Sequence, residues 1–267
     1  MLPPRVWDKP SASVSPPLRV FITGASSGLG AALARHYGAL GAQLGLAGRR
    51  LAGLQDTAAG LDARLYQADV RDIAAMQNAA AAFLNDIGVP DIVIAAAGIS
   101  IGTLTEEAAD APVFRAVMDA NVLGLVHTFQ PFIAAMQSNG GALCAISSVA
   151  GVRGLPGGGA YSASKAAATV YLEALRLELK ARGIAVVTVA PGYIDTPMTR
   201  VNPYAMPFKM SAPTAAARVA RCIAQRRSYT VIPWQMAWAA RALKWLPNPV
   251  YDLIFEKAPR KPRGLPR

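Results

Sequence analysis

The sequence is poor in cysteine, histidine and charged residues, and it has no long apolar run. Its 267 residues include two cysteines and two histidines, and only 16% are charged. Two cysteines cannot form a disulfide framework, and neither Cys144 nor Cys222 has a second Cys or His at metal-ligand spacing. We therefore expect no metal site and a reducing, cytoplasmic setting. No apolar run reaches the ~20 residues that a membrane-spanning helix needs.

The chain is instead rich in apolar residues, and its positive charge is concentrated at one end. A hydrophobic fraction of 53% excludes a disordered chain. The net charge is +11, yet residues 1–200 hold 15 Lys and Arg against 14 Asp and Glu, whereas residues 201–267 hold 12 against 2. Because no base-stacking or groove-reading module accompanies this basic end, we expect no nucleic-acid partner.

Short apolar runs alternate with Ala-rich stretches from residue 18 onward. The runs predict strands over 18–24, 42–48, 64–70, 91–98, 141–148, 183–192 and 228–233. Between them we expect helices near 29–40, 50–59, 72–87, 112–137, 162–182 and 213–226. This alternation predicts an α/β fold with a doubly wound parallel sheet of about seven strands, covered by helices on both faces.

The same pattern divides the chain into three parts. Residues 1–17, rich in Pro and Ser, are expected to be a flexible leader without the apolar stretch of a secretory signal. Residues 18–232 form the predicted catalytic domain, and 233–267 form a basic, aromatic C-terminal extension. Within the domain, residues 193–212 follow the end of a strand and predict a substrate lid.

A glycine-rich turn follows the first predicted strand and leads into a helix. In Thr23–Gly30 (TGASSGLG), Gly24 permits a tight turn, Gly28 lets the backbone approach a diphosphate, and Gly30 lets the helix pack on the strand. The helix N-terminus adds free N–H groups for an anion. The turn therefore predicts a dinucleotide site in a Rossmann-type sheet.

The stretch 24–28 also matches G-x-S-x-G, the nucleophile turn of α/β-hydrolases, with Ser26 as nucleophile. That chemistry needs a histidine on a loop late in the chain. His36 and His127 both lie inside predicted helices, so the hydrolase is the weaker interpretation.

An arginine stands where the second strand ends. NAD-binding units of this kind usually place an acidic residue there, whereas a guanidinium matches a ribose 2′-phosphate. Arg49 therefore favours NADP(H) over NAD(H). The alternative is that Arg49 and Arg50 are solvated loop charges.

Three further residues form a candidate catalytic group. Tyr161 and Lys165 are four apart on a predicted helix and therefore share one face. An ammonium beside a phenol lowers the phenol pKa and makes tyrosine usable as an acid or base. Ser148 ends a neighbouring strand, where its hydroxyl can stabilise charge on a substrate oxygen.

Together these motifs resemble the classical short-chain dehydrogenase/reductase family over about residues 18–200. The resemblance rests on TGASSGLG at 23–30, Asp69-Val70, AAAG at 95–98, Asn121-Val122, ISS at 146–148, YSASK at 161–165 and PG at 191–192. It implies that Tyr161 is the proton donor, Lys165 lowers its pKa and holds the nicotinamide ribose, and Ser148 orients the substrate oxygen. Asn121 would hold a proton-relaying water, and Ser147 would be a structural neighbour.

The cofactor-binding set implied by the turn and the resemblance is Gly24, Ser26, Ser27, Gly28, Leu29, Gly30, Arg49, Asp69, Val70, Ala96, Gly98, Tyr161, Lys165, Pro191, Gly192, Ile194 and Thr196. One position departs from the family, which usually has Asn-Ala-Gly where this chain has Ala96-Ala97-Gly98. We expect a small loss of rigidity or cofactor affinity there.

The expected function is NADP(H)-dependent hydride transfer to or from a carbonyl or secondary alcohol. Expected substrate contacts are Ser148, Leu155, Tyr161, Tyr193 and Met198, and the apolar members of this set favour an apolar substrate. Packing of the lid on the core would explain the same residues equally well. The alternative function is a non-catalytic dinucleotide-binding, membrane-associated protein.

Two expectations concern partners. Members of the family commonly form dimers or tetramers through the helices at 112–137 and 162–182. Residues 233–255 carry three of the four tryptophans, which suits peripheral contact with an anionic membrane. The favoured alternative is a tail that packs over the cleft or against a partner subunit.

Overall fold

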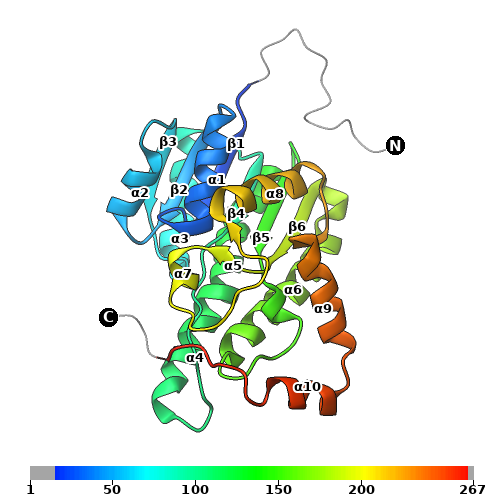
Figure 1. Ribbon diagram of the computed structural model, residues 1–267. Helices are drawn as coiled ribbons and strands as arrows, with labels where there is room; N and C mark the ends of the chain where they lie inside the picture. Colours follow the sequence, from blue (N-terminus) through cyan, green and yellow to red (C-terminus); the bar gives the residue numbers. More distant parts are fainter. Residues whose placement is uncertain (1–15, 264–267) are drawn as a thin grey trace.

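Seven parallel strands form the centre of the protein (Figure 1). The computed structural model describes residues 16–263, so the predicted leader lies almost wholly outside the described residues. The sheet order is β3-β2-β1-β4-β5-β6-β9. These strands are β1 (Arg19–Thr23), β2 (Gln43–Gly48), β3 (Ala63–Gln67), β4 (Ile92–Ala95), β5 (Gly141–Ile146), β6 (Ile184–Pro191) and β9 (Tyr229–Ile232). The predicted doubly wound α/β fold is confirmed.

Alternate strand residues enter two separate cores, one on each face of the sheet. Val20 and Ile22 pack under α1 (Gly28–Ala39), α2 (Leu51–Ala58) and α8 (Ala212–Ala224). Phe21, between them, packs on the other face with Phe83 and Phe132 at centroid distances of 5.4 and 4.8 Å. That second face is covered by α3 (Ile73–Asp86), α5 (Gly124–Met136) and α6 (Gly159–Glu178).

The strand order reverses between β1 and β4. From β1 the chain builds outward through β2 and β3, and then returns to place β4 on the other side of β1. The two connections leave in opposite directions, which opens a crevice at the carboxyl ends of β1 and β4. The glycine-rich turn after β1 lies at this crevice.

The helix predicted over 112–137 is interrupted, which corrects that prediction. It consists of α4 (Ala111–Met118), a π-helical turn (Asp119–Leu123) and α5. In the wider turn the N–H of Gly124 donates to the carbonyl of Asp119, five residues earlier. Such turns insert one extra residue into a helix and often mark functional sites. Here the turn carries Asn121.

The predicted lid has regular structure of its own. Residues 193–212 contain β7 (Ile194–Asp195), α7 (Pro197–Arg200) and β8 (Met210–Ser211), and β7 pairs with β8 in a small parallel ribbon. The main chain of Met210 also donates to the carbonyl of Tyr193. The segment therefore closes on itself beside the carboxyl edge of the main sheet. Its movement as a lid stays a prediction.

The C-terminal extension packs on its own subunit. It forms α9 (Trp234–Trp245) and α10 (Asn248–Phe255), and then runs toward α4 (Figure 1). In α9 only Met236 and Ala240 are buried. The Arg153 guanidinium donates to the carbonyl of Leu243 at 2.9 Å and so fastens the end of this helix. Among the described residues, no helix has the length and apolar character needed to cross a membrane.

Candidate active site

A cleft of about 320 Å³ runs along the carboxyl ends of the strands. Every residue of the predicted cofactor set lines it, from the glycine-rich turn to Thr196. Several lining residues were not in the predicted cofactor or substrate sets: Gly48, Arg50, Ala68, Arg71, Ala97, Ile99, Ala120, Ile146, Ser147, Pro197 and Thr199. Most of them directly adjoin a motif position, so sequence proximity was the signal that could have found them.

The glycine-rich turn is too tight for side chains. Gly24 has φ +70°, and a Cβ there would lie 2.7 Å from the backbone of Ala97. A Cβ on Gly30 would lie 2.3 Å from the Gly24 carbonyl oxygen. Ser27 precedes α1 in an extended conformation, and its side chain does not cap the helix. The first N–H groups of α1 therefore remain free for an anion, which fits the diphosphate of a dinucleotide.

Three arginines line the cleft: Arg49 and Arg50 follow β2, and Arg71 follows β3. Arg71 is held by Asp69, with Nη2 2.6 Å from Oδ2 and Nε 3.1 Å from Oδ1. Burial raises the pKa of Asp69, but the hydrogen bonds from Arg71 outweigh it and hold that pKa below its usual value. Within the described part of the chain, Arg49 and Arg50 have no carboxylate at ion-pair distance. Their guanidinium groups remain available for a phosphate.

The candidate catalytic residues meet at the inner end of the cleft. Burial raises the pKa of Tyr161, and a hydrogen bond with the Ser148 side chain partly opposes that rise. Lys165 Nζ donates to the Ile146 carbonyl at 2.8 Å and lies 5.8 Å from the centroid of the Tyr161 ring. Burial lowers the pKa of Lys165 to about 8.

The expected lowering of the Tyr161 pKa is therefore wrong for this structure. Lys165 directs its ammonium group to a backbone carbonyl, and the loss of solvent around the phenol has the larger effect. A phenol whose pKa lies above its ordinary value keeps its proton at neutral pH.

Asn121 joins three elements through the π-helical turn. Its Oδ1 accepts from the Ile99 N–H at 2.8 Å, and its Nδ2 donates to the Ile99 carbonyl and to Ser164 Oγ, both at 2.9 Å. Both amide hydrogens are occupied, so a water held by Asn121 would have to donate to one of its oxygens. Ser147 also has a structural contact, because its hydroxyl lies 2.9 Å from Thr169 Oγ1.

The predicted substrate residues separate into two groups. Ser148, Tyr161 and Met198 line the cleft, whereas Leu155 and Tyr193 do not. Tyr193 packs its ring on Tyr204 of the lid, with centroids 6.3 Å apart. Contact of Leu155 and Tyr193 with a substrate stays a prediction.

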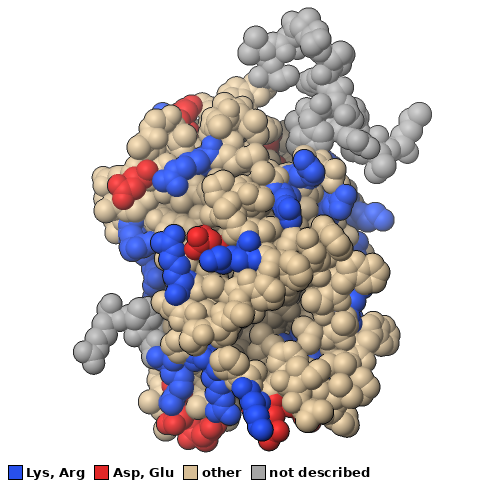
Figure 2. Space-filling model, viewed as in Figure 1, with Lys and Arg blue, Asp and Glu red and all other residues tan. Residues whose placement is uncertain are grey.

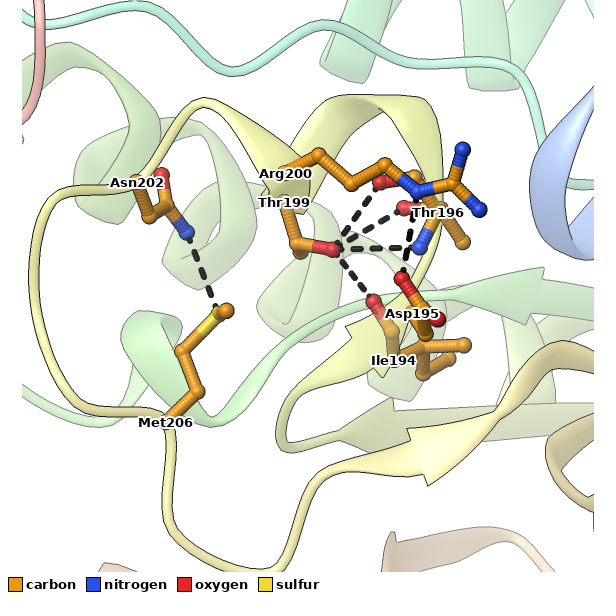
Figure 3. A network of polar contacts seen from close by, with 7 residues as sticks. All are labelled: Ile194, Asp195, Thr196, Thr199, Arg200, Asn202 and Met206. Carbon is orange, nitrogen blue, oxygen red and sulfur yellow. Dashed lines mark hydrogen bonds and ion pairs between the residues drawn. The ribbon is translucent and has the colours of Figure 1, made fainter.

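Polar contacts within the lid hold its first turn in place (Figure 3). Thr196 and Thr199 cap α7 reciprocally, and Arg200 Nε lies 3.3 Å from Asp195 Oδ1. A Cβ on Gly28 would lie 3.3 Å from Thr196 Cγ2, so these two segments almost touch. Farther along the segment, Asn202 Nδ2 lies 3.7 Å from Met206 Sδ. Thr196 is thereby fixed opposite the proposed diphosphate site.

Comparison with known proteins identifies the family. The family model described as short chain dehydrogenase matches residues 19–205. The chain belongs to the short-chain dehydrogenase/reductase family. An uncharacterized oxidoreductase from Myxococcus xanthus is 35% identical over 237 residues, which cover 86% of this chain and 93% of that protein. An uncharacterized oxidoreductase from Mycobacterium tuberculosis is 34% identical, with 86% and 94% covered.

Solved structures of this family have the same fold. A short chain dehydrogenase from Burkholderia cenocepacia in complex with NADP has a TM-score of 0.79 and 28% identity, covering 90% of this chain and 97% of that one. A variant of actinorhodin polyketide ketoreductase with NADPH has a TM-score of 0.74 and 26% identity, with 81% and 95% covered.

Membership in the short-chain dehydrogenase/reductase family makes the protein an NAD(P)-dependent oxidoreductase. The prediction of such an enzyme is confirmed, and the non-catalytic alternative loses its support. The Ser26 hydrolase also lacks a base, because neither His36 nor His127 lines the cleft. His127 Nδ1 instead lies 2.8 Å from the Val70 carbonyl oxygen.

Proposed function

We propose that the enzyme transfers a hydride between NADP(H) and the carbonyl or secondary alcohol of an apolar substrate, with Tyr161 as acid and base. The observation that carries this proposal is the meeting of Tyr161, Ser148 and Lys165 at the inner end of the lined cleft. A bound NADP(H) supplies or accepts the hydride at its nicotinamide ring. The protein must bind that ring, orient the substrate oxygen and move one proton.

Each of the three residues has one task in this proposal. Tyr161 Oη gives its proton to the carbonyl oxygen during reduction and takes it back during oxidation. Ser148, which lines the cleft beside Tyr161, holds the same substrate oxygen. Lys165 lies beneath the ring, where its charge stabilises a phenolate after the proton has left.

An apolar substrate is supported by the lid. Met198 lines the cleft, and Met198 and Phe208 are 39% and 54% exposed. Covering these side chains with an apolar group would remove their surface from water.

A homodimer or homotetramer is supported by apolar side chains exposed on α4, the π-helical turn and α6. These side chains are Phe114, Leu123, Val170 and Leu177.

The preference for NADP(H) is tested at Arg49. We expect Arg49→Ala to lower the ratio of kcat/KM with NADPH to that with NADH by about 10–100-fold. The reason is that a charge-assisted hydrogen bond to a phosphate contributes about 1.5–3 kcal/mol. Steady-state rates with both cofactors give the ratio. Arg182→Ala, an exposed arginine outside the cleft, is the matched control. An unchanged ratio in Arg49→Ala would show that Arg49 does not bind the 2′-phosphate.

A second proposal concerns the outer face of the tail, which we assign to contact with an anionic membrane. Trp234, Trp238 and Trp245 lie on one side of α9 and are 66%, 64% and 82% exposed. The Arg241 guanidinium lies 5.4 Å from the Trp238 ring centroid on the same side. Most of the surface over α9 and α10 in Figure 2 is uncharged. Exposed tryptophans beside basic groups suit a headgroup layer.

Vesicle co-sedimentation tests this contact. We expect the full chain to bind vesicles containing phosphatidylserine, and expect replacement of all three α9 tryptophans by serine to weaken binding at least tenfold. Replacement of the exposed apolar residues Leu40, which follows α1, and Ile73, which begins α3, is the control. Equal partitioning of wild type and the triple variant would end the proposal. Light scattering gives the molecular mass of both proteins. If the triple variant has a lower mass than wild type but binds vesicles equally well, this face is a subunit interface instead.

A further inference from the structure

The C-terminal segment brings a second ammonium group to Tyr161. Lys261 lies near the end of the described chain, about 100 residues after the catalytic tyrosine, yet its Nζ is 5.6 Å from the centroid of the Tyr161 ring. Lys165 Nζ lies at a similar distance, 5.8 Å, from the same centroid. Lys261 does not line the cofactor cleft and is held instead by the loop after β4, where its Nζ is 2.6 Å from Ser100 Oγ.

The segment that carries Lys261 is fastened on both sides of that residue. The Gly102 N–H donates to the Pro262 carbonyl at 2.9 Å. Arg263 donates to Asp110 Oδ2 at 2.8 Å and to Glu107 Oε1 at 3.2 Å. A Cβ on Gly157 would come within 2.9 Å of the Arg260 side chain, so the loop before α6 lies directly against the segment. These contacts fix the Lys261 ammonium in place.

Lys261 lacks the counter-ion that its neighbour has. Arg263 forms ion pairs with Asp110 and Glu107, whereas Lys261 has no carboxylate at ion-pair distance among residues 16–263. Ser100 satisfies only one of its three N–H groups. The residue is half-buried, and burial lowers its pKa to about 8. A partly desolvated ammonium costs free energy unless an anion joins it.

We propose that Lys261 and Ser100 bind a carboxylate group of the substrate, so that the preferred substrates are oxo acids and the matching hydroxy acids. The inference rests on the proposed oxidoreductase function of the same site, and it adds one charged carboxylate to a substrate that is otherwise apolar. The Lys261 ammonium can donate to one carboxylate oxygen. The Ser100 hydroxyl, which accepts from Lys261, keeps its own hydrogen for the other oxygen. The carbonyl would then lie toward Tyr161 and the apolar part of the substrate toward Met198.

The test compares acids with their neutral esters. The probes are 3-oxobutanoate, 4-oxopentanoate and 5-oxohexanoate, each beside its methyl ester, with NADPH as reductant. We expect wild type to reduce at least one acid with a kcat/KM about tenfold or more above that of its ester. Lys261→Met should lower this acid-to-ester ratio by about 10–100-fold, mainly through KM of the acid, because a charge-assisted hydrogen bond is lost. Lys261→Arg should restore part of the ratio.

Lys257→Met is the matched control, since Lys257 is an exposed lysine in the same segment. It should leave the acid-to-ester ratio unchanged. Melting temperatures of all variants show whether the segment stays folded. A wild type that reduces the esters as well as the acids would overturn the inference while the proposed function stands. The same holds if Lys261→Met lowers both rates equally, because Lys261 would then act on Tyr161 or on folding. Failure to reduce any aldehyde or ketone would overturn the proposed function itself.

Discussion

Tyr161→Phe is expected to lower kcat for carbonyl reduction by about 10²–10⁴-fold, the usual contribution of a positioned general acid. The change removes only the phenolic oxygen. The ring remains and keeps its place beside Lys165 and Lys261. Ser148 is far too weak an acid to replace the phenol, and the ammonium groups of Lys165 and Lys261 are directed to the Ile146 carbonyl and to Ser100 Oγ. The loss should therefore appear in kcat, with little change in the binding of NADPH.

Steady-state kinetics and titration of NADPH fluorescence separate these two effects. The dissociation constant of NADPH should stay within about threefold of the wild-type value. Tyr171→Phe is the matched control, because Tyr171 lies ten residues later on α6 and outside the cleft. Its turnover should be close to that of wild type. If Tyr161→Phe kept more than a tenth of wild-type turnover, another group would have to supply the proton.

Much of the fold could be predicted because its signals are local. The apolar run of β1 is visible in consecutive residues, and it serves both cores because Val20 and Ile22 point to one face and Phe21 to the other. The break in the helix at Asp119–Leu123 is different, because its cause is tertiary. Asn121 contacts Ile99 and Ser164, which lie 22 and 43 residues away in the sequence, and no local sequence pattern predicts those contacts.

The same difference between local signals and tertiary contacts applies to the candidate site. Its contiguous motifs, such as the glycine-rich turn, could be read because each residue type has a fixed task at a fixed spacing. The direction in which the Tyr161 pKa shifts could not be predicted, because it depends on how much solvent the folded chain removes from around the phenol. Arg71 and Lys261 were missed for a related reason. Their neighbours at the site come from folding: Arg71 is held by Asp69, and Lys261 reaches Tyr161 from about 100 residues away.

Gly30→Ala should have the second largest effect, and it acts on the framework of the cleft. The added methyl carbon would lie 2.3 Å from the Gly24 carbonyl oxygen and 3.1 Å from the Ala25 nitrogen. Both neighbours are backbone atoms of the same turn, so no side chain can move aside. The first turn of α1 must shift away from β1. Overpacking of this kind costs about 1–3 kcal/mol and occasionally more.

Two measurements should therefore change together in Gly30→Ala. The melting temperature should fall by roughly 3–10 °C, since each kcal/mol corresponds to about 2–4 °C in a domain of this size. The dissociation constant of NADPH should rise at least tenfold, because the free N–H groups of α1 move from the diphosphate site. Gly159→Ala is the control: Gly159 is exposed at the start of α6 and has nothing within 4 Å of an added Cβ. An unchanged melting temperature with unchanged NADPH binding would show that the turn tolerates a side chain and that its glycine is not required for the close contact of α1 with β1.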